Sequence, residues 1–442
     1  MSFKPQQLSF SIDSLGDSFG RVFFYNDRVF RAIQNSAVKE CLEFLNSHLF
    51  VLLEENGFIP KTKIADDIEV EGVDLILEHE RLFETKPHEW SFSMLREMAS
   101  FVLYLNDLCG RYGYELKDAH PHNFLFKDGH PVMVDIGSFQ RKRPQWSAHK
   151  EFVHTFYLPL LLWSRGEMFW SRLILESDNY PYRVIPFQSP DDSEYVQHLL
   201  WPITQYSIKF HDSFRTSKRC VFHLVQRLNK WASFILGKPN LQLFDSTRSY
   251  RELSTEDIEI LSPPPSTTKC NSSSFDYSEV AIFLENYCYC NNQHGLLLTN
   301  RRCKDVIELV RSTTRFDRIL VIDNSSNNID ILFQDYKGYS DVTPLMTSII
   351  NPPDLDSALT RFHSDFVICL GIIEHYLLDG FLLTTILERI YSLTDKYIFI
   401  IIDYNKTSYS PEAFLEQLSI FFKRVAYHCR AKELLCFVGI KD

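Results

Sequence analysis

The chain has 442 residues, of which 45% are hydrophobic and 23% are charged, and its formal net charge is −11. This length predicts about two to three domains, and the composition is that of a core-forming globular protein rather than a disordered one. The negative charge argues against nucleic acid as a partner, because phosphate binding needs a basic surface. The only compact basic run is 141–143, which we interpret as a solvated turn.

The cysteines and the N-terminal residues indicate a reduced, cytoplasmic protein. The 10 cysteines are scattered without a CxxC pair, so they predict neither a zinc site nor a disulfide framework. The N-terminus lacks the apolar segment of a signal peptide. The longest apolar runs, such as 156–163, are too short to cross a bilayer, so we expect no membrane span.

The first elements along the chain are predicted strands and helices in a mixed order. Two β-rich runs within 19–33 flank an Asn-Asp pair and predict a hairpin. The apolar pattern of 37–56 is helical, whereas 73–78 is an apolar strand. A helix is then expected from an N-cap at Ser91 or Ser93 to about residue 108.

A group of polar candidates follows in residues 116–139. Two apolar runs flank an Asp-Gly turn there, which predicts a second hairpin. In that hairpin Asn123 lies beside Asp135 at one edge, and Asp118 lies on the loop just before it. Two carboxylates and an amide that converge there make an oxygen site suited to a divalent cation that holds phosphates, and the third group can accept a proton from an attacking hydroxyl.

Two short motifs in this segment carry a resemblance. KDAHPHN resembles the catalytic loop of aminoglycoside-phosphotransferase-type kinases, and VDIG is similar to the metal-binding DFG element of protein kinases. The resemblance implies an α+β kinase-like domain that uses ATP and Mg2+. It implies Asp118 as the catalytic base, and Asn123 and Asp135 as metal ligands. The alternative is a polar turn in which these side chains cap backbone groups.

Arg31 stands where such kinases have a phosphate-pairing lysine, so the resemblance implies that it binds the nucleotide. Glu40 or Glu43, on the helix that follows, could pair with it. The alternative is that both acids are exposed helix charges. The glycine-rich loop of kinases is represented here only by Gly16 and Gly20.

Residues 165–245 are predicted to be largely helical, and a Pro- and Ser-rich stretch from 262 onward is the clearest linker. After it, strands and helices alternate, which predicts a parallel α/β sheet with any ligand at the carboxyl ends of the strands. The predicted strands are 318–323, 342–346, 366–370 and 397–402, and the predicted helices are 304–311, 328–337 and 381–391. The predicted domains are a kinase-like domain 1–165, its helical extension 166–250, a linker 251–276 and a methyltransferase-like domain 277–442.

A wider resemblance joins the two halves. HEWSFSMLREMASFVLYL, the hairpin segment above, and Trp146 with residues 152–162 resemble a bacterial family of class I SAM-dependent methyltransferases, nodulation-protein NoeA-like. In that family a kinase-like half precedes a methyltransferase half with a Rossmann-like fold. The resemblance covers most of 20–165 and resumes after about residue 277. It implies SAM as the cofactor of the second half.

The same resemblance implies a set of cofactor-binding residues. ILVIDNSSNN stands where the family has its glycine-rich SAM loop, which places Asp323, Asn324 and Ser325 at the cofactor. SDFVICLGIIEHYL resembles the segment after the fourth strand, with Glu374 and His375 as its acid-histidine pair. The loop here has no glycine, and no acid ends the next predicted strand. The alternative is that these side chains cap a loop and a helix N-terminus.

Three hypotheses follow for the function. The first is a SAM-dependent methyltransferase, and so a transferase, acting on a glycan or another cytosolic metabolite. The second is an ATP- and Mg2+-dependent phosphotransferase that works on a small molecule or glycan through the N-terminal half. The third is a non-catalytic protein that keeps both folds for ligand sensing or as a scaffold.

Overall fold

The structure is a computed structural model that describes residues 2–11, 14, 17–176, 253–263, 281–282, 293–313, 316–403, 406–407, 409–431 and 434–441. The chain divides into two compact units, residues 1–176 with 255–442, and residues 177–254. All elements below belong to the first unit. The predicted helical extension and linker lie largely outside the described residues, apart from helices α6 (Met168–Glu176) and α9 (Thr255–Glu259).

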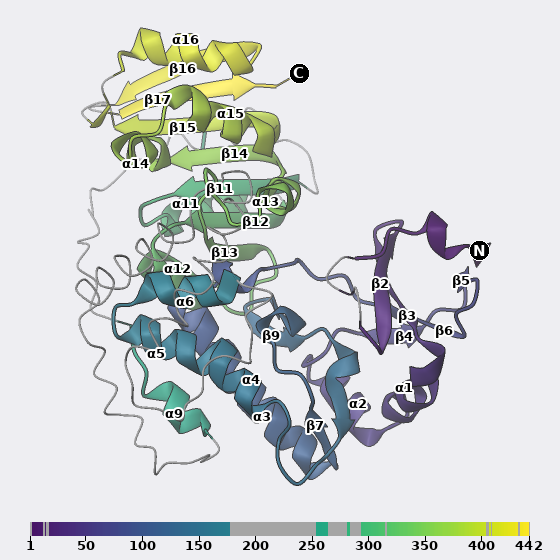
Figure 1. Ribbon diagram of the computed structural model, residues 1–442. Coiled ribbons are helices and arrows are strands. Elements are labelled where there is room, and N and C mark those ends of the chain that lie inside the picture. The colour runs from purple at the N-terminus through teal and green to yellow at the C-terminus, as the bar shows by residue number, and fades with distance from the viewer. Residues whose placement is uncertain are drawn as a thin grey trace, which may run out of the picture. The chain divides into compact units, whose positions relative to one another are not determined.

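The N-terminal strands form a four-stranded antiparallel sheet in the order β2-β3-β6-β4 (Figure 1). Asn26 and Asp27 join the first two strands with φ angles of 47° and 64°, the left-handed conformation that a tight hairpin requires. The hairpin predicted in residues 19–33 is therefore confirmed. The strands are β2 (Gly20–Tyr25), β3 (Arg28–Ile33), β4 (Thr62–Ile64) and β6 (Leu75–His79), and a short parallel pair joins β1 (Ser2–Phe3) to β5 (Glu69–Val70).

Along the chain, two helices come between the strands of this sheet and a third follows them. The helix predicted over 37–56 is two helices, α1 (Val38–Leu45) and α2 (His48–Glu55), because the Ser47 hydroxyl accepts a bond from Phe50 N and starts a new helix. The long helix α3 (Phe92–Arg111) begins after Ser91, whose hydroxyl accepts a bond from Met94 N at 3.5 Å. One face of α3 is buried throughout its length, so it forms the core of this region.

The second predicted hairpin is formed by β8 (Phe124–Lys127) and β9 (His130–Met133). Asp128 and Gly129 make its turn with φ angles of 54° and 72°. A second strand pair is formed by β7 (Tyr114–Leu116) and β10 (Phe139–Arg141). Helical segments follow: α4 (His149–Phe152), a π-helical turn (Val153–Tyr157), α5 (Leu158–Ser164) and α6.

The C-terminal part is one seven-stranded sheet in the order β13-β12-β11-β14-β15-β17-β16. β11 is third in this order and lies between β12 and the central strand β14, the pairs from β13 to β15 are parallel, and β17 is antiparallel to both of its neighbours. This is a Rossmann-like α/β sheet, as the alternating pattern predicts. Its strands are β11 (Gln293–Thr299), β12 (Phe316–Asp323), β13 (Val342–Met346), β14 (Ser364–Leu370), β15 (Thr394–Asp403), β16 (Arg424–Ala431) and β17 (Leu434–Ile440).

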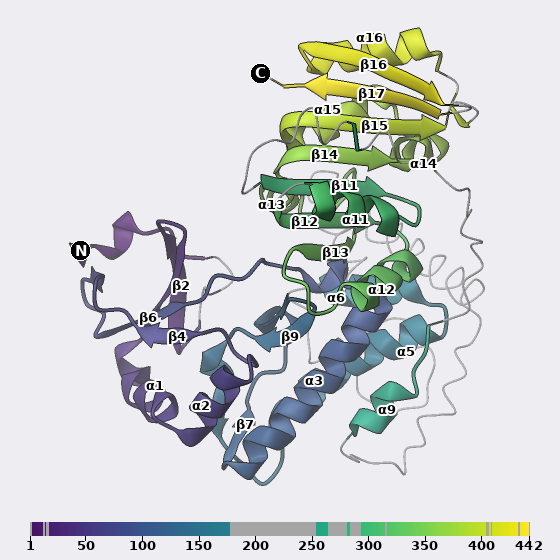
Figure 2. The ribbon, with the colours of Figure 1, turned by 180° about the vertical axis from the view of Figure 1, so that it is seen from behind.

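Helices cover both faces of this sheet (Figures 1 and 2). Right-handed crossovers that run outward from β11 place their helices on one face, and crossovers in the other direction place them on the opposite face. The strand order therefore reverses between β11 and β14, which makes this the topological switch point. The helices are α11 (Lys304–Thr313), α12 (Ser326–Asp335), α13 (Leu355–Phe362), α14 (Ile372–Leu378), α15 (Leu383–Leu393) and α16 (Pro411–Phe421).

Helix α12 also contacts the start of α3. Ser93 N donates to Asp330 Oδ1 at 2.8 Å, and Phe92 N donates to Ser326 Oγ at 3.3 Å. These bonds satisfy amides of the first turn of α3, which have no partner within their own helix. No helix in the described part of the chain has the length and hydrophobicity needed to cross a membrane.

Candidate functional sites

The β8–β9 hairpin brings the predicted N-terminal residues to one place. Val134 N donates to Asn123 O at 2.8 Å, so these two residues lie opposite each other at the open end of the hairpin. Asp135 follows directly and begins a short helical turn, η6 (Ile136–Ser138). The register that the sequence predicts is therefore confirmed, and it places Asn123 beside the Asp135 loop.

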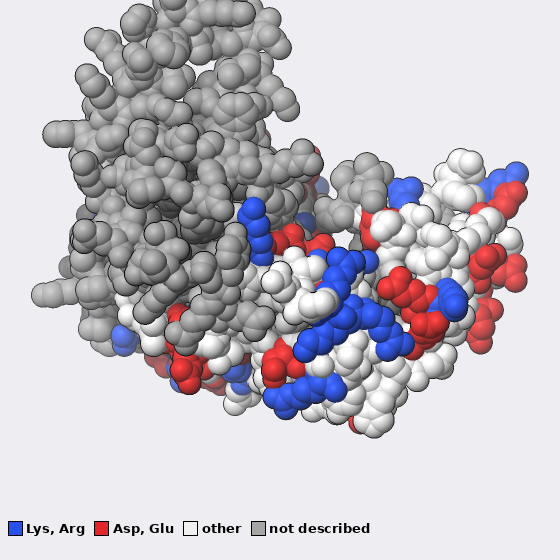
Figure 3. All heavy atoms as spheres, turned by 60° about the horizontal axis from the view of Figure 1, so that its bottom comes forward, with Lys and Arg blue, Asp and Glu red and all other residues white. Residues whose placement is uncertain are grey.

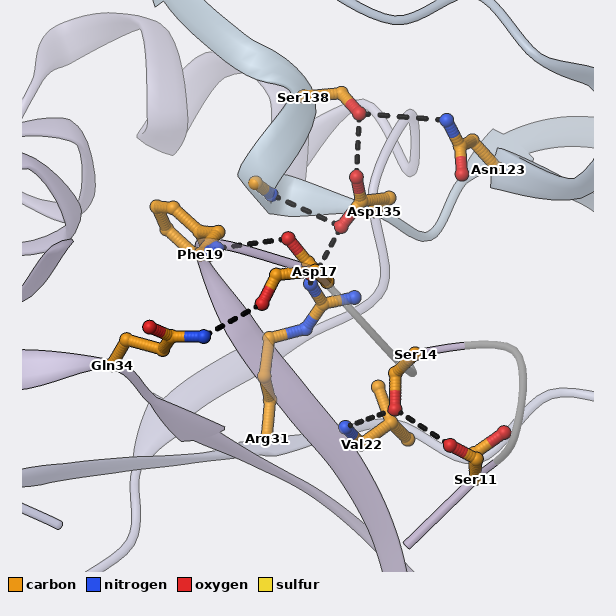
Figure 4. Close-up of polar contacts among 11 residues, drawn as sticks. Ser11, Ser14, Asp17, Phe19, Val22, Arg31, Gln34, Asn123, Asp135 and Ser138 are labelled. Atoms are coloured by element: carbon orange, nitrogen blue, oxygen red, sulfur yellow. Dashed lines mark hydrogen bonds and ion pairs between the residues drawn. The ribbon is translucent and has the colours of Figure 1, made fainter.

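Asp135 is the centre of a hydrogen-bonded network (Figure 4). Its Oδ1 accepts from Arg31 Nη1 at 2.6 Å and from Gly137 N at 3.2 Å, and its Oδ2 accepts from Ser138 Oγ at 2.5 Å. Asn123 Nδ2 reaches the same serine hydroxyl at 3.5 Å. The amide and the carboxylate are therefore linked through Ser138.

Arg31 supplies the positive charge of this network. Its Nη1 also lies 3.2 Å from Asp17 Oδ2, and only 7% of its side chain is exposed. Burial alone would raise the pKa of Asp135, but the charge of Arg31 and the hydrogen bonds outweigh it and hold that pKa below its ordinary value. Of the two alternatives for Glu40 and Glu43, exposed helix charges are what the structure shows, because β3 directs the Arg31 guanidinium toward Asp17 and Asp135 instead.

Asp118 lies on the loop that precedes this network. Its Oδ1 accepts from His120 N at 2.9 Å, which folds the loop into a turn, and its side chain is partly exposed. No group of three or more His, Cys, Asp or Glu side chains suited to a metal occurs in the described part of the chain. The two predicted ligands, Asn123 and Asp135, are an amide and a carboxylate, so their role at a metal stays a prediction.

The C-terminal sheet has one more strand at its start than the sequence predicts. The sequence predicts 318–323 as the first strand of the sheet, and that prediction is wrong: β11 precedes it along the chain and lies between β12 and β14. The loop that follows the first strand is therefore 300–303, and it also lacks glycine. Asp323 consequently ends the second strand, where the methyltransferase resemblance expects a ribose-holding acid.

Asp323 is buried and bonded within its own loop. It is 1% exposed; its Oδ1 accepts from Ser325 N at 2.7 Å and its Oδ2 from Asn328 Nδ2 at 2.9 Å. Burial raises the pKa of Asp323 to about 7, although both hydrogen bonds oppose the rise. Ser325 in turn caps α12 through its hydroxyl. The capping role considered for Asp323 is thus present.

Four buried oxygens without a hydrogen-bond partner lie at the carboxyl ends of four neighbouring strands. Within the described part of the chain, Asn300 Oδ1, Asn324 Oδ1 and Thr347 Oγ1 follow β11, β12 and β13, and Glu374 Oε2 lies in the first turn of α14, after β14. A buried polar atom left unpaired costs roughly 1–3 kcal/mol, so native proteins seldom keep several together. A ligand that donates hydrogen bonds would satisfy this row of oxygens.

Glu374 and His375 lie on different faces of α14, one buried and one partly exposed. Glu374 is 2% exposed, and its Oε1 accepts from Asp403 N at 2.6 Å and lies 3.7 Å from Arg301 Nη2. Burial raises its pKa. The side chain of His375 is 36% exposed, and its Nε2 lies 3.6 Å from Asp379 Oδ2 on the same helix. Of the two, Glu374 belongs to the buried strand edge, whereas His375 faces outward.

Lysine and arginine side chains gather on one face of the N-terminal region (Figure 3). In the basic run, the Arg141 guanidinium lies 4.6 Å from the Tyr114 ring centroid, and its Nη2 lies 3.9 Å from Glu43 Oε2. Lys142 Nζ lies near Gly110, in the last turn of α3, where a cation stabilises the helix dipole. The structure is thus compatible with the solvated turn inferred from the sequence.

Sequence reasoning missed two members of these sites. Asp17 joins Arg31 although it precedes β2, and Arg301 reaches Glu374 from the loop after β11. The apolar run 296–298, which follows Gly295 and is flanked by polar residues, was the signal that could have revealed β11 and hence Arg301.

Comparison with known proteins gives a partial match. No protein-family model matches the chain. It is 31% identical over 174 residues to nodulation protein NoeA from Rhizobium meliloti (strain 1021), covering 35% of this chain and 36% of that protein. The chain thus matches about a third of the length of this relative.

Among solved structures, the N-methyltransferase NodS from Bradyrhizobium japonicum WM9 is 12% identical, covers 37% of this chain and 91% of that one, and has a TM-score of 0.29. The 1,6-didemethyltoxoflavin-N1-methyltransferase from Burkholderia thailandensis is 13% identical, with 37% and 76% covered and a TM-score of 0.29. Part of the chain has a Rossmann-like fold, as its own strand order shows.

Proposed function

We propose that the C-terminal sheet binds SAM and that the protein is a SAM-dependent methyltransferase. The observation that carries this proposal is the row of buried, unpartnered oxygens at the carboxyl ends of β11 to β14. SAM offers hydrogen-bond donors along its whole length, namely an ammonium group, two ribose hydroxyls and an adenine amino group. A row of acceptors at the switch point of an α/β sheet complements such a ligand.

In this proposal Asp323 holds the ribose. It ends the second strand, and each of its oxygens already accepts one bond, which leaves a further lone pair on each for a ribose hydroxyl. Asn324 and Ser325 shape the loop around it, and Glu374 lies across the switch point. SAM supplies the methyl group when it is bound; the chain orients it and excludes water. For the acceptor we propose a glycan or another small metabolite, as the family resemblance implies.

The test of this proposal is calorimetric titration of S-adenosylhomocysteine into the wild type and into Asp323→Ala. Loss of the two ribose bonds should weaken binding about 30- to 1,000-fold, since a hydrogen bond to a charged group contributes roughly 2 kcal/mol. Asp317→Asn is the matched control, because Asp317 is exposed at the other end of the same strand and should leave the affinity unchanged. Equal affinity of Asp323→Ala and wild type would sink the ribose assignment.

A second candidate function is an ATP- and Mg2+-dependent phosphotransferase, with a kinase-like fold in residues 1–165. The convergence of Asn123 and Asp135 at the open end of the β8–β9 hairpin, beside Arg31, favours it. Asp118 would accept the proton of the attacking hydroxyl, and Arg31 would bind phosphate. Nucleotide binding would require Arg31 to leave Asp135, so that the carboxylate could hold the metal.

This second candidate predicts that Asp135→Asn removes magnesium-dependent nucleotide binding, measured by fluorescence titration of a labelled ATP with and without Mg2+. The affinity gained from Mg2+ in the wild type should disappear in the variant, because an amide holds a divalent cation far less well than a carboxylate. Asp107→Asn, at an exposed helix position, is the control. If Mg2+ raises the nucleotide affinity of Asp135→Asn as much as that of the wild type, the metal-site interpretation is wrong. If neither SAM nor ATP binds, the ligand-sensing or scaffold hypothesis takes precedence.

A further inference from the structure

The loops after β11 and β14 approach each other closely at the switch point. Gly371 heads α14 with a φ of 71°, and an added Cβ there would lie 2.5 Å from Arg301 Nε and 2.8 Å from Asn300 Oδ1. Both side chains therefore lie directly against the backbone of Gly371. A glycine is required there for two reasons, the left-handed backbone and the lack of room for a side chain.

The loop after β11 is held in this position by Thr299. Its hydroxyl accepts from Arg301 N at 3.0 Å and donates to Arg301 O at 3.0 Å, which fixes the backbone of the arginine. The guanidinium then points toward Glu374, with 17% of its side chain exposed. The separation of 3.7 Å between Arg301 Nη2 and Glu374 Oε1 is longer than a hydrogen bond, so the two charges attract without closing that contact.

Three complementary groups thus meet at the switch point: a guanidinium, a carboxylate oxygen and an amide oxygen. Glu374 Oε2 and Asn300 Oδ1 are buried and have no partner within the described part of the chain. A guanidinium presents a planar fork that matches a carboxylate, and an ammonium group offers three donors to nearby oxygens. Together they match the two charges of an α-amino acid.

We propose that Arg301 is the specificity-determining residue of this site, and that it binds the carboxylate of an α-amino-acid group on the ligand. Glu374 and Asn300 accept the ammonium of the same group. The inference rests on the proposed function, because SAM is a nucleoside that carries such a group. It explains how a loop without glycine holds the amino-acid end of the cofactor: a side chain replaces backbone amides.

The test compares S-adenosylhomocysteine with 5′-methylthioadenosine, which has the same nucleoside but no amino-acid group. Calorimetry on the wild type should show the first ligand binding at least about 10-fold more tightly. In Arg301→Met that preference should vanish, while 5′-methylthioadenosine should bind within about twofold of its wild-type affinity. Glu374→Gln should weaken only the amino-acid ligand, because it keeps the shape and removes the attraction for ammonium.

Arg302→Met is the matched control, since it removes an exposed arginine from the same loop and should leave both affinities unchanged. Arg301→Lys, which keeps the charge, should fold like the wild type and retain part of the preference. Equal weakening of both ligands in Arg301→Met, or no weakening of either, would overturn the role of Arg301 while leaving the proposed function standing. Failure of both ligands to bind the wild type would overturn the proposed function itself.

Discussion

Replacing Arg361 by methionine should lower the free energy of unfolding of the protein by about 3–5 kcal/mol. Arg361 lies on α13, and its Nη1 and Nη2 donate to Glu89 Oε2 and Oε1 at 2.9 and 2.5 Å. The two side chains are 9% and 2% exposed. The substitution leaves the carboxylate of Glu89 buried without its hydrogen-bonded ion-pair partner, and it also removes the bond to Glu84 O at 2.9 Å.

Urea unfolding, followed by tryptophan fluorescence, measures this effect. Glu89→Gln combined with Arg361→Met should recover part of the loss, since the double variant no longer buries a single charge. Lys337→Met is the matched control, because the Lys337–Glu97 ion pair also links the C-terminal sheet region to helix α3. These side chains are 32% and 24% exposed, so the loss of this pair should lower the free energy of unfolding by about 1 kcal/mol or less. A cost for Arg361→Met no larger than that of Lys337→Met would contradict the buried-pair interpretation.

Replacing Arg31 by methionine should destabilise the N-terminal region by about 3 kcal/mol at neutral pH, because it leaves the half-buried Asp135, whose side chain is 19% exposed, beside Asp17 without the arginine. In the wild type the pKa of Asp135 lies below its ordinary value, so its pairing stabilises the fold above the unfolded pKa of about 3.9 and is lost as the pH falls through the folded value. Without Arg31, burial should raise that pKa.

The loss in free energy of unfolding that Arg31→Met causes should therefore become smaller as the pH is lowered toward about 4, where Asp135 of the variant becomes protonated. Unfolding in urea at several pH values measures it. Arg31→Lys is the control, since it keeps one positive charge near Asp135 but lacks the guanidinium whose Nη1 contacts both Asp17 and Asp135; it should lose less stability at neutral pH. A loss of stability in Arg31→Met that is the same at every pH would show that lost packing, and not lost charge pairing, destabilises the variant.

Local sequence patterns predicted the elements whose structure is set by neighbours along the chain. Both hairpins are where the Asn26-Asp27 and Asp128-Gly129 pairs indicated, because only a few residue types adopt the left-handed turn conformation. The hairpin register also placed Asn123 beside Asp135. Ser91 begins α3 as expected of a hydroxyl before a helical pattern.

Features that depend on residues far apart in the sequence could not be predicted in this way. Arg31 pairs with Asp135 across 104 residues, and Arg361 pairs with Glu89 across 272, with no local signal for either choice. The first strand of the C-terminal sheet was missed because its apolar run is short and has no helical or alternating period. That omission displaced the strand count and hid the fact that Asp323 ends the second strand, where we propose that the ribose binds.

The most direct test of the central claim is a crystal structure of the full chain grown with S-adenosylhomocysteine. We expect the nucleoside at the carboxyl ends of β11, β12 and β14, with its ribose hydroxyls on Asp323. Its amino-acid group should lie between Arg301 and Glu374. A nucleoside bound instead at the Arg31 and Asp135 network, or an empty strand edge in crystals grown at saturating ligand, would contradict the account.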